Sequence, residues 1–269
     1  MAKCCLLADI IKAMQNPLSL DAHAHLDPRR TSAELAEAGA VLAMTLSLDE
    51  ADKVVHRKEP LIAWGVGCHP RKLAAQQAFK SDHFAQLAEH AAIIGEIGLD
   101  VAYQVPFELQ LKTFRAALTF AAQNPRILSI HSFSTSSHSR MRTTSLMLEE
   151  LHRTPVIAPI LHWWTGTAAE TRQAVELGCY FSVHSAVARR SIFRTQVPLE
   201  RLLVESDHGW ADPPGAIPHR VIWVEYLLSA LLSMDVREVR QLVWQNFSEV
   251  VRLTGAQELL PPGLVGRLR

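Results

Sequence analysis

Near the start of the sequence, His23 and His25 follow the apolar residues Leu18 and Leu20. On an extended strand, residues i and i+2 point to the same face, so both imidazoles would face one site. Imidazole nitrogens are donors of borderline softness that suit divalent transition metals. Buried, hydrogen-bonded histidines are common, so this pair alone is weak evidence for a metal site. Its meaning depends on what else the fold brings to the same place.

Further histidines and carboxylates occur at the ends of later apolar runs. One histidine in such a place is usually a satisfied core or loop residue, but a whole set at one site is better explained by a metal. A mixed set of imidazoles and carboxylates suits zinc, manganese or a similar ion, and magnesium less well because several donors are nitrogen. The further candidates are His69, Glu96, His131, His162, Glu205 and Asp207.

These residues must be positioned by eight apolar runs of strand length, which alternate with helical patterns along the chain. Most runs are hydrophobic throughout, as expected for parallel strands that are buried on both faces. The alternation predicts an α/β fold, a single (β/α)8 TIM-type barrel that forms one domain over residues 1–269. The predicted strands are 18–23, 41–46, 61–66, 92–97, 127–130, 156–161, 179–183 and 201–205.

The catalytic groups of such barrels lie at the carboxyl ends of the strands, on one face of the molecule. Every candidate ligand maps to that face. The alternative architecture is an open, doubly wound sheet, but no Gly-rich dinucleotide-binding pattern follows the first strand. A helix is also predicted at 31–38, ended by Gly39.

The composition limits the classes of function. Lys and Arg number 27 and Asp and Glu number 27, which argues against a wholly basic nucleic-acid-binding module but allows a local basic patch. The 4 cysteines show no CxxC spacing, which indicates a reducing compartment. The first residues are too polar for a signal sequence, and no long apolar span follows. We therefore expect a cytoplasmic protein that does not contact a membrane.

The candidate ligands lie in motifs that resemble those of the TatD-like metal-dependent deoxyribonucleases, a branch of the amidohydrolase-like barrels. The resemblance covers nearly the whole chain in the family's order, and the GEIGLD stretch is its most specific part. The matching motifs are Asp21-Ala-His23-Ala-His25-Leu-Asp27, Gly67-Cys-His69-Pro70, Ile94-Gly-Glu96-Ile-Gly-Leu-Asp100, Ile130-His131, Leu161-His162, Leu203-Val-Glu205-Ser-Asp207 and the tail 246–253.

The resemblance implies two divalent metal ions, zinc, manganese or magnesium, and in some relatives a third. His23, His25 and Asp207 would bind the first metal. Glu96 would bridge to the second, and two further histidines would complete that site. Two other residues would approach a third metal or the scissile phosphate. The histidines of the second site are His131 and His162, and the last two residues are His69 and Glu205.

The implied reaction is hydrolysis of the phosphodiester bonds of DNA by an exonuclease that acts on single strands or accessible ends. A metal pair can activate water and stabilise the attacking and leaving oxygens of such a displacement. Glu96 and Asp207 would be the catalytic residues, and Asp207 is placed to take the proton of the attacking water.

Basic residues follow several strands and would form a rim around the metals where phosphates dock. Trp163, Trp164 and Trp210 fall in the same loops and could stack on bases, although arginine is common in loops and tryptophan can fill the mouth of a barrel. The predicted nucleic-acid-binding residues are Arg29, Arg30, Arg71, Lys72, Arg140, Arg142, Arg189 and Arg190.

The chain departs from the family pattern at 162–166, at His208 and in the loop 132–141. These departures leave two alternatives open. One is an amidohydrolase-type enzyme for a small amide, lactone or phosphotriester, although such relatives often use a carboxylated lysine where this chain has Glu96. The other is a partner-gated or inactive subunit of a Qat-type antiviral defence complex, and here the intact ligand set argues only against loss of activity.

Overall fold

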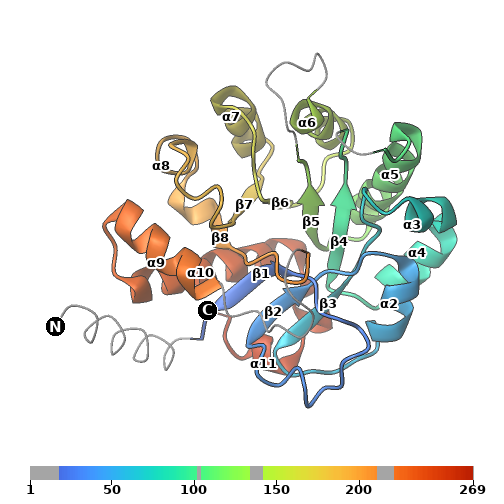
Figure 1. Ribbon diagram of the computed structural model, residues 1–269, viewed down its shortest axis with the longest axis horizontal. Helices are drawn as coiled ribbons and strands as arrows, with labels where there is room; N and C mark the ends of the chain where they lie inside the picture. Colours follow the sequence, from blue (N-terminus) through green and yellow to red (C-terminus); the bar gives the residue numbers. More distant parts are fainter. Residues whose placement is uncertain (1–17, 102–103, 134–141, 211–220, 269) are drawn as a thin grey trace.

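The computed structural model describes residues 18–101, 104–133, 142–210 and 221–268. Its centre is one sheet of parallel strands whose spatial order is the order of the sequence (Figure 1). The strands are β1 (Leu20–Ala24), β2 (Ala40–Ala43), β3 (Ile62–Val66), β4 (Ile93–Gly98), β5 (Ile127–His131), β6 (Ile160–His162), β7 (Tyr180–Val183) and β8 (Leu202–Val204).

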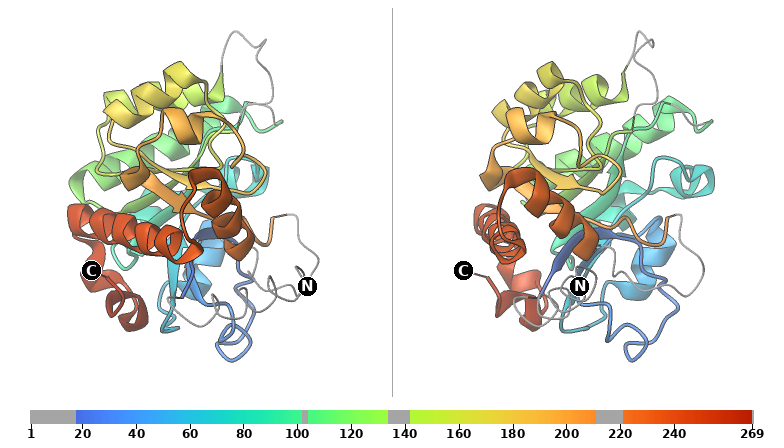
Figure 2. Two further views of the ribbon diagram at one scale, coloured as in Figure 1. Left: turned by 90° about the vertical axis from the view of Figure 1, so that its left-hand side faces the viewer. Right: turned by 60° about the vertical axis from the view of Figure 1, so that its left-hand side comes forward.

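Helices surround the strands on the outside, as the turned views in Figure 2 make clear. Every strand residue is buried, because one face of each strand packs into the barrel and the other against helices. The predicted (β/α)8 barrel is therefore confirmed. The helices are α2 (Leu48–Val54), α3 (Leu73–Ala78), α4 (Ser81–Ala88), α5 (Phe107–Gln123), α6 (Thr143–Arg153), α7 (Ala168–Glu176), α8 (Ile192–Thr195), α9 (Val221–Leu232), α10 (Val236–Thr254) and α11 (Pro262–Val265), with 3-10 turns at Leu199–Arg201 and Ala256–Leu259.

The barrel nearly closes where the end of β1 meets the residues that follow β8. The Asp207 N–H donates to the His23 carbonyl at 3.0 Å, and the His25 N–H donates to the His208 carbonyl at 2.6 Å. Gly209 comes so close that an added Cβ would lie 2.0 Å from the His25 carbonyl oxygen, so only glycine fits there. This seam joins candidate ligands that are far apart in the sequence.

A buried side chain reinforces the same seam. Asp21 in β1 accepts hydrogen bonds from the Ser206 N–H at 3.0 Å and from the Ser206 hydroxyl at 2.5 Å. Both residues are almost fully buried. The first aspartate of the DAHAH motif therefore links β1 to the residues that follow β8.

Two predicted elements differ from the structure. The sixth strand begins at Ile160 rather than at 156, because Ala158 has a positive φ of 48° and Pro159 has no N–H to donate to a ladder. The stretch 31–38 forms turns and not a helix. Its backbone hydrogen bonds mix i−4 and i−3 acceptors. The Leu35 N–H donates to the Thr31 carbonyl, and the Ala36 N–H donates to the Ala33 carbonyl.

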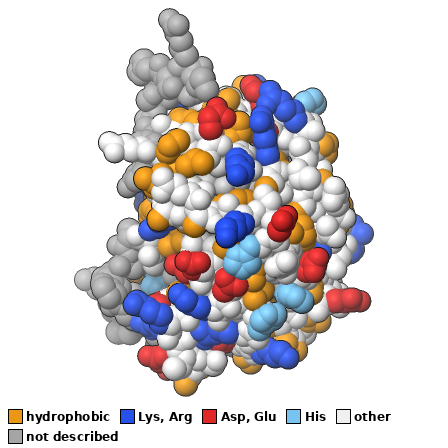
Figure 3. Space-filling model, turned by 90° about the vertical axis from the view of Figure 1, so that its right-hand side faces the viewer, with side chains coloured by type: hydrophobic (Ala, Val, Ile, Leu, Met, Phe, Trp, Pro, Cys, Tyr) orange, Lys and Arg blue, Asp and Glu red, His pale blue; other side chains and the backbone are white. Residues whose placement is uncertain are grey.

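The surface carries both signs of charge. On the face shown in Figure 3, Lys and Arg side chains are interspersed with Asp and Glu side chains, in keeping with the balanced composition. Among the described residues, no helix is both long and apolar enough to cross a membrane.

Candidate metal centre

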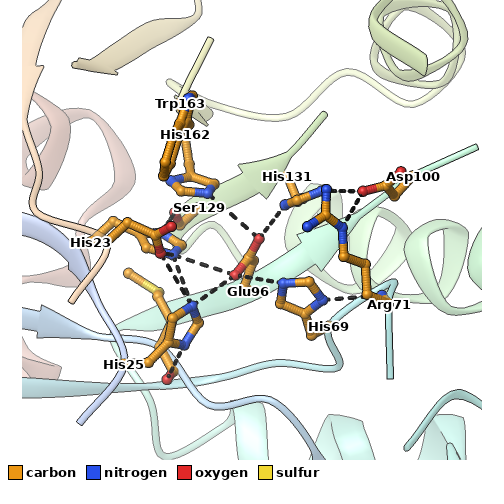
Figure 4. Close-up of polar contacts among 12 residues, drawn as sticks. His23, His25, His69, Arg71, Glu96, Asp100, Ser129, His131, His162 and Trp163 are labelled. Atoms are coloured by element: carbon orange, nitrogen blue, oxygen red, sulfur yellow. Dashed lines mark hydrogen bonds and ion pairs between the residues drawn. The ribbon is translucent and has the colours of Figure 1, made fainter. Parts of the chain in front are cut away.

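The predicted ligands meet at the carboxyl ends of the strands (Figure 4). His23 lies in β1 and Glu96 in β4, while others are the last residues of their strands or follow them directly. All are buried, with exposed fractions of 8% or less. The residues brought together are His23, His25, His69, Glu96, His131, His162, Glu205 and Asp207.

Glu96 lies at the middle of the cluster, and one of its oxygens faces three histidines. Oε2 is 3.0 Å from His25 Nε2, 3.3 Å from His69 Nε2 and 3.4 Å from His23 Nε2. His23 and His25 are two positions apart on an extended segment, so their side chains share a face. Both Nε2 atoms therefore reach this oxygen from one side.

The other oxygen of Glu96 faces a different pair. Oε1 is 2.6 Å from His131 Nδ1 and 3.7 Å from His162 Nε2. The carboxylate thus presents one oxygen to each of two histidine groups, which is the arrangement expected of a residue shared by two cations.

Three sets of potential ligand atoms lie within 4.8 Å of one another. The first set matches the predicted first metal, and Glu96 is common to the other two. The predicted ligands His131 and His162 of the second metal fall into separate sets. The sets are His23 with His25 and Asp207, His23 with Glu96 and His162, and His69 with Glu96 and His131.

His23 in β1 and His25 just after it are oriented by contacts of their Nδ1 atoms. His25 Nδ1 lies 3.1 Å from the Met44 carbonyl, and His23 Nδ1 lies 2.7 Å from the Ser129 hydroxyl. A carbonyl only accepts, so Nδ1 of His25 must carry the proton and its Nε2 is left as a free donor for a metal. The outer contacts therefore set the ligating atoms.

His162 and His131 are held in a similar way by carboxylates. His162 Nδ1 is 2.9 Å from Glu205 Oε1, and His131 Nε2 is 3.0 Å from Asp100 Oδ2. Arg71 donates to the same Asp100 carboxylate. Such carboxylate–histidine pairs fix the ring and strengthen the nitrogen on its far side as a ligand.

His69 differs from the other histidines in its hydrogen bonding. Its Nδ1 lies 3.0 Å from the backbone N–H of Arg71 and accepts that hydrogen bond. In the neutral ring the proton must then be on Nε2, the atom that faces Glu96. This tautomer makes His69 a hydrogen-bond donor toward the centre, which favours a contact to phosphate over ligation of a third metal.

The acidic groups are strongly perturbed. Burial would raise the pKa of Glu96, but His69, His131 and His162 outweigh it and hold that pKa well below its usual range. Burial raises the pKa of Asp207 to about 7, although His162 and His25 oppose the shift. Groups of this kind cluster at functional sites.

The donor set fits divalent cations. His25 Nε2 lies 3.0 Å from Glu96 Oε2, yet no described residue gives that oxygen a hydrogen bond of good geometry, and Asp207 Oδ1 and Glu205 Oε2 are likewise unpaired. Buried carboxylate oxygens without partners are costly unless a cation or other group satisfies them. Oxygen donors mixed with imidazole nitrogens suit a first-row transition metal.

A cavity of about 200 Å3 opens over the cluster. The Ser132 hydroxyl is buried there and has no hydrogen-bond partner among the described residues. Aromatic rings and one arginine form much of the remaining wall. The lining consists of His69, Arg71, Glu96, His131, Ser132, Phe133, His162, Trp163, Asp207 and Trp210.

The predicted basic rim divides into paired and unpaired members. Arg29 pairs with Asp27, Arg142 with Glu170, and Arg190 donates to the carbonyls of Trp164 and Gly166. Arg71 reaches the cavity while bound to Asp100, and Lys72 Nζ lies 4.9 Å from the Trp210 ring centroid. The Arg30 and Arg189 side chains form no ion pair among the described residues, and Arg140 lies outside that part of the chain.

Three residues that contact the cluster or line its cavity, Asp100, Ser129 and Ser132, were not predicted as site residues from the sequence. Asp100 could have been found, because it ends the GEIGLD motif that carries Glu96. The two serines offered no such signal. Ser129 in β5 is brought to His23 in β1 only by closure of the barrel, across 106 positions of sequence.

A family model described as "TatD related DNase" matches residues 20–252. The chain belongs to this family. The resemblance predicted from the motifs is thereby confirmed. The 3'-5' ssDNA/RNA exonuclease TatD of Citrobacter koseri is 28% identical over 56% of this chain and 60% of that protein, so the match spans less than two thirds of that relative.

Two further comparisons cover nearly the whole of the related protein. The uncharacterized metal-dependent hydrolase YcfH of Escherichia coli K12 is 24% identical over 88% of this chain and 97% of YcfH. The crystal structure of YJJV, a TatD homolog from the same organism, superposes with a TM-score of 0.70 at 21% identity, over 86% of this chain and 97% of YJJV. The structural likeness supports the fold described above.

Proposed function

We propose that this protein is a metal-dependent phosphodiesterase that shortens DNA from single-stranded or accessible ends. The observation that carries the proposal is the position of Glu96, whose two oxygens face separate histidine groups. The names of relatives support the substrate class, since they include 3'-5' ssDNA/RNA exonucleases and a human 3'-5' RNA nuclease.

We assign the ligands as two overlapping sets that share Glu96. Two divalent ions, zinc, manganese or magnesium, would polarise the phosphodiester and lower the pKa of an attacking water. One set is His23, His25, Asp207 and Glu96, and the other is Glu96, His131 and His162.

Asp207 is the proposed proton acceptor. Its Oδ1 is buried and unpaired among the described residues, and it lies 3.6 Å from His25 Nε2. A carboxylate in that position is within reach of a water that attacks a phosphate held at the cluster. The backbone of Asp207 has a positive φ of 47° and is anchored to β1 by its N–H, so the carboxylate is held in place.

The substrate phosphate would be held by groups that line the cavity and do not ligate. His69 presents Nε2–H, Ser132 presents an unpaired hydroxyl, and Arg71 supplies positive charge. The cavity of about 200 Å3 is smaller than the ~300–1,000 Å3 typical of pockets for drug-sized ligands. It suits part of one unpaired nucleotide better than the end of a duplex.

The test is cleavage of end-labelled single- and double-stranded oligonucleotides by metal-stripped protein with zinc, manganese or magnesium added back. We expect stepwise shortening of the single strand that depends on the metal and is lost in Asp207→Asn and Glu96→Ala. Thermal unfolding of both variants shows whether the barrel is intact. Full metal-stimulated activity in Glu96→Ala would contradict the assignment of a shared ligand.

Absence of cleavage by a protein that binds about two metals per chain would favour the amidohydrolase-type alternative, with a small amide, lactone or phosphotriester as substrate. It would also fit an enzyme gated by partner proteins of a defence complex, which stays a prediction. Stable co-purification with partner proteins would support gating, and a monomer free of partners would contradict it.

A further inference from the structure

The wall of the cavity contains an aromatic ring with an unusual backbone. Trp163 follows the ligand His162 and has a positive φ of 43°. A bulky residue in this left-handed region is an outlier that persists only where surrounding contacts impose it. Such outliers are concentrated at functional sites.

The contact that fixes this conformation is buried. The Trp163 N–H donates to Glu205 Oε1 at 2.9 Å, and the same oxygen contacts His162 Nδ1 at 2.9 Å. Arg190 holds the next turn of the loop by donating to the carbonyls of Trp164 and Gly166 at 3.0 and 2.8 Å. The indole is therefore positioned by the same carboxylate that orients a metal ligand.

Among the described residues, the Trp163 indole stacks face to face on one ring, while the His162 ring stands nearly perpendicular to it with centroids 6.2 Å apart. The indole is stacked on His184, with centroids 3.8 Å apart and planes at 20°. His184 is itself fixed, because its Nδ1 accepts the Ala186 N–H at 3.2 Å. Trp163 lines the cavity and His184 does not, so the indole separates His184 from the cavity and presents its other side there. Figure 4 shows Trp163 beside His162 at the edge of the cluster.

The other two tryptophans near the site are already covered. Trp164 is fully buried and donates Nε1–H to the Thr171 hydroxyl at 2.9 Å, so it belongs to the core. Trp210 lies parallel to His69 at 4.4 Å, and the Arg71 and Lys72 cations lie over its ring. Of the three, Trp163 is stacked on one ring and has no cation over it among the described residues.

We infer that the Trp163 indole, backed by His184, is the platform on which the base next to the cleaved phosphodiester stacks. This inference rests on the proposed function and extends it by assigning a subsite for the base. Stacking on an aromatic side chain is tolerant of sequence and requires a base that is not paired. A platform beside a metal ligand therefore favours unpaired ends whatever their sequence.

A substrate pair isolates the contact. One oligonucleotide carries a normal base at the end that the enzyme shortens, and the other carries an abasic tetrahydrofuran residue there. For the wild type we expect kcat/KM to be about 5- to 150-fold higher with the base, the range that stacking by one base supports. In Trp163→Ala the two substrates should become equivalent, because only the normal one loses a contact. Trp163→Phe should keep most of the preference.

A binding measurement makes the outcome independent of cleavage. In the Asp207→Asn background with calcium present, dAMP should bind more tightly than 2-deoxyribose 5-phosphate by a similar factor, and Trp163→Ala should remove the difference. If the Asp207→Asn protein that retains Trp163 binds the two ligands equally, the inference is overturned, even if cleavage is observed. A binding difference that depends on Trp163, without cleavage of any oligonucleotide, would sustain the platform and overturn the proposed reaction. Metal content and thermal unfolding verify that the variants are folded and loaded.

Discussion

Glu205 Oε1 lies 2.9 Å from His162 Nδ1, and both side chains are buried at the carboxyl ends of β8 and β6. The pair places Glu205 where it would orient the candidate ligand His162, whereas the motif resemblance alone left it near a third metal or the phosphate. Its second contact, to the Trp163 N–H, links the metal centre to the wall of the cavity.

Replacing Glu205 should therefore weaken metal binding without removing a ligand. In Glu205→Ala the His162 Nδ1–H loses its acceptor, and we expect metal affinity to fall about 10- to 100-fold. Glu205→Gln keeps an acceptor oxygen and should be much closer to the wild type. Titration calorimetry with zinc measures both, with the exposed carboxylate variant Glu200→Ala as the control. Wild-type affinity in Glu205→Ala would show that the contact does not position the ring.

His69 and His131 should behave differently although both face Glu96. His69→Ala removes a hydrogen-bond donor but not a proposed metal ligand, so we expect the number of bound metals to stay the same. The rate of phosphodiester cleavage should fall about 100-fold, which is within the rate effect of one positioned catalytic group. His131→Ala should lose metal. Elemental analysis after dialysis distinguishes the two, and loss of one metal from His69→Ala would make it a ligand after all.

The barrel and the meeting of the candidate ligands could be predicted because each candidate lies at or near the end of a continuous apolar run, which fixes both its strand and its face. The residues that orient the candidate ligands could not be predicted. Ser129 in β5 reaches His23 in β1 only because the closed barrel brings these unpaired strands together, and the acceptor for His25 is a backbone carbonyl that any residue at position 44 would supply.

For the basic rim, the positions of the residues could be predicted from the sequence, but the partners of their side chains could not. Arg142 and Arg190 fall in loops on the correct face, as predicted, but their guanidinium groups bind Glu170 and two backbone carbonyls. A sequence gives the position of a charge and not its partner, because the partner comes from another βα unit. The prediction of a helix at 31–38 was wrong for a related reason. Local helical propensity is weak evidence, and tertiary contacts can override it.

Glu170 should make stability dependent on acid pH. Burial raises its pKa, but hydrogen bonds from Thr144, Ser145 and Thr167 outweigh this and lower the pKa from 4.5 to about 2. Since the folded pKa is depressed, this stabilisation is fully present above pH 4.5 and is lost as the pH falls toward 2. Allowing for partial solvent screening, we expect about 1–2 kcal/mol at pH 7.

Urea unfolding of Glu170→Gln at pH 7 and at pH 3 tests this dependence. The variant should be less stable than the wild type at pH 7, and the difference should shrink at pH 3. Glu176→Gln, an exposed position on the same helix α7, should change little at either pH. A difference between Glu170→Gln and the wild type that stays constant with pH would mean that the lost hydrogen bonds, and not the charge, account for the effect.

The salt dependence of binding should separate basic residues that contact phosphates from those with structural partners. Lys72 is exposed, and its ammonium lies beside Trp210 at the cavity, so Lys72→Ala should reduce the slope of log K against log salt for single-stranded DNA by about 0.7. Arg142→Ala should leave that slope unchanged and instead lower stability, because its loss removes the ion pair with Glu170 at 3.0 Å. Fluorescence anisotropy with a labelled oligonucleotide and a chelator, repeated from low to high salt, measures the slope without cleavage. A slope that changes in Arg142→Ala but not in Lys72→Ala would place the bound strand on the side of α6 and α7, away from the His69 and Trp210 edge of the cavity.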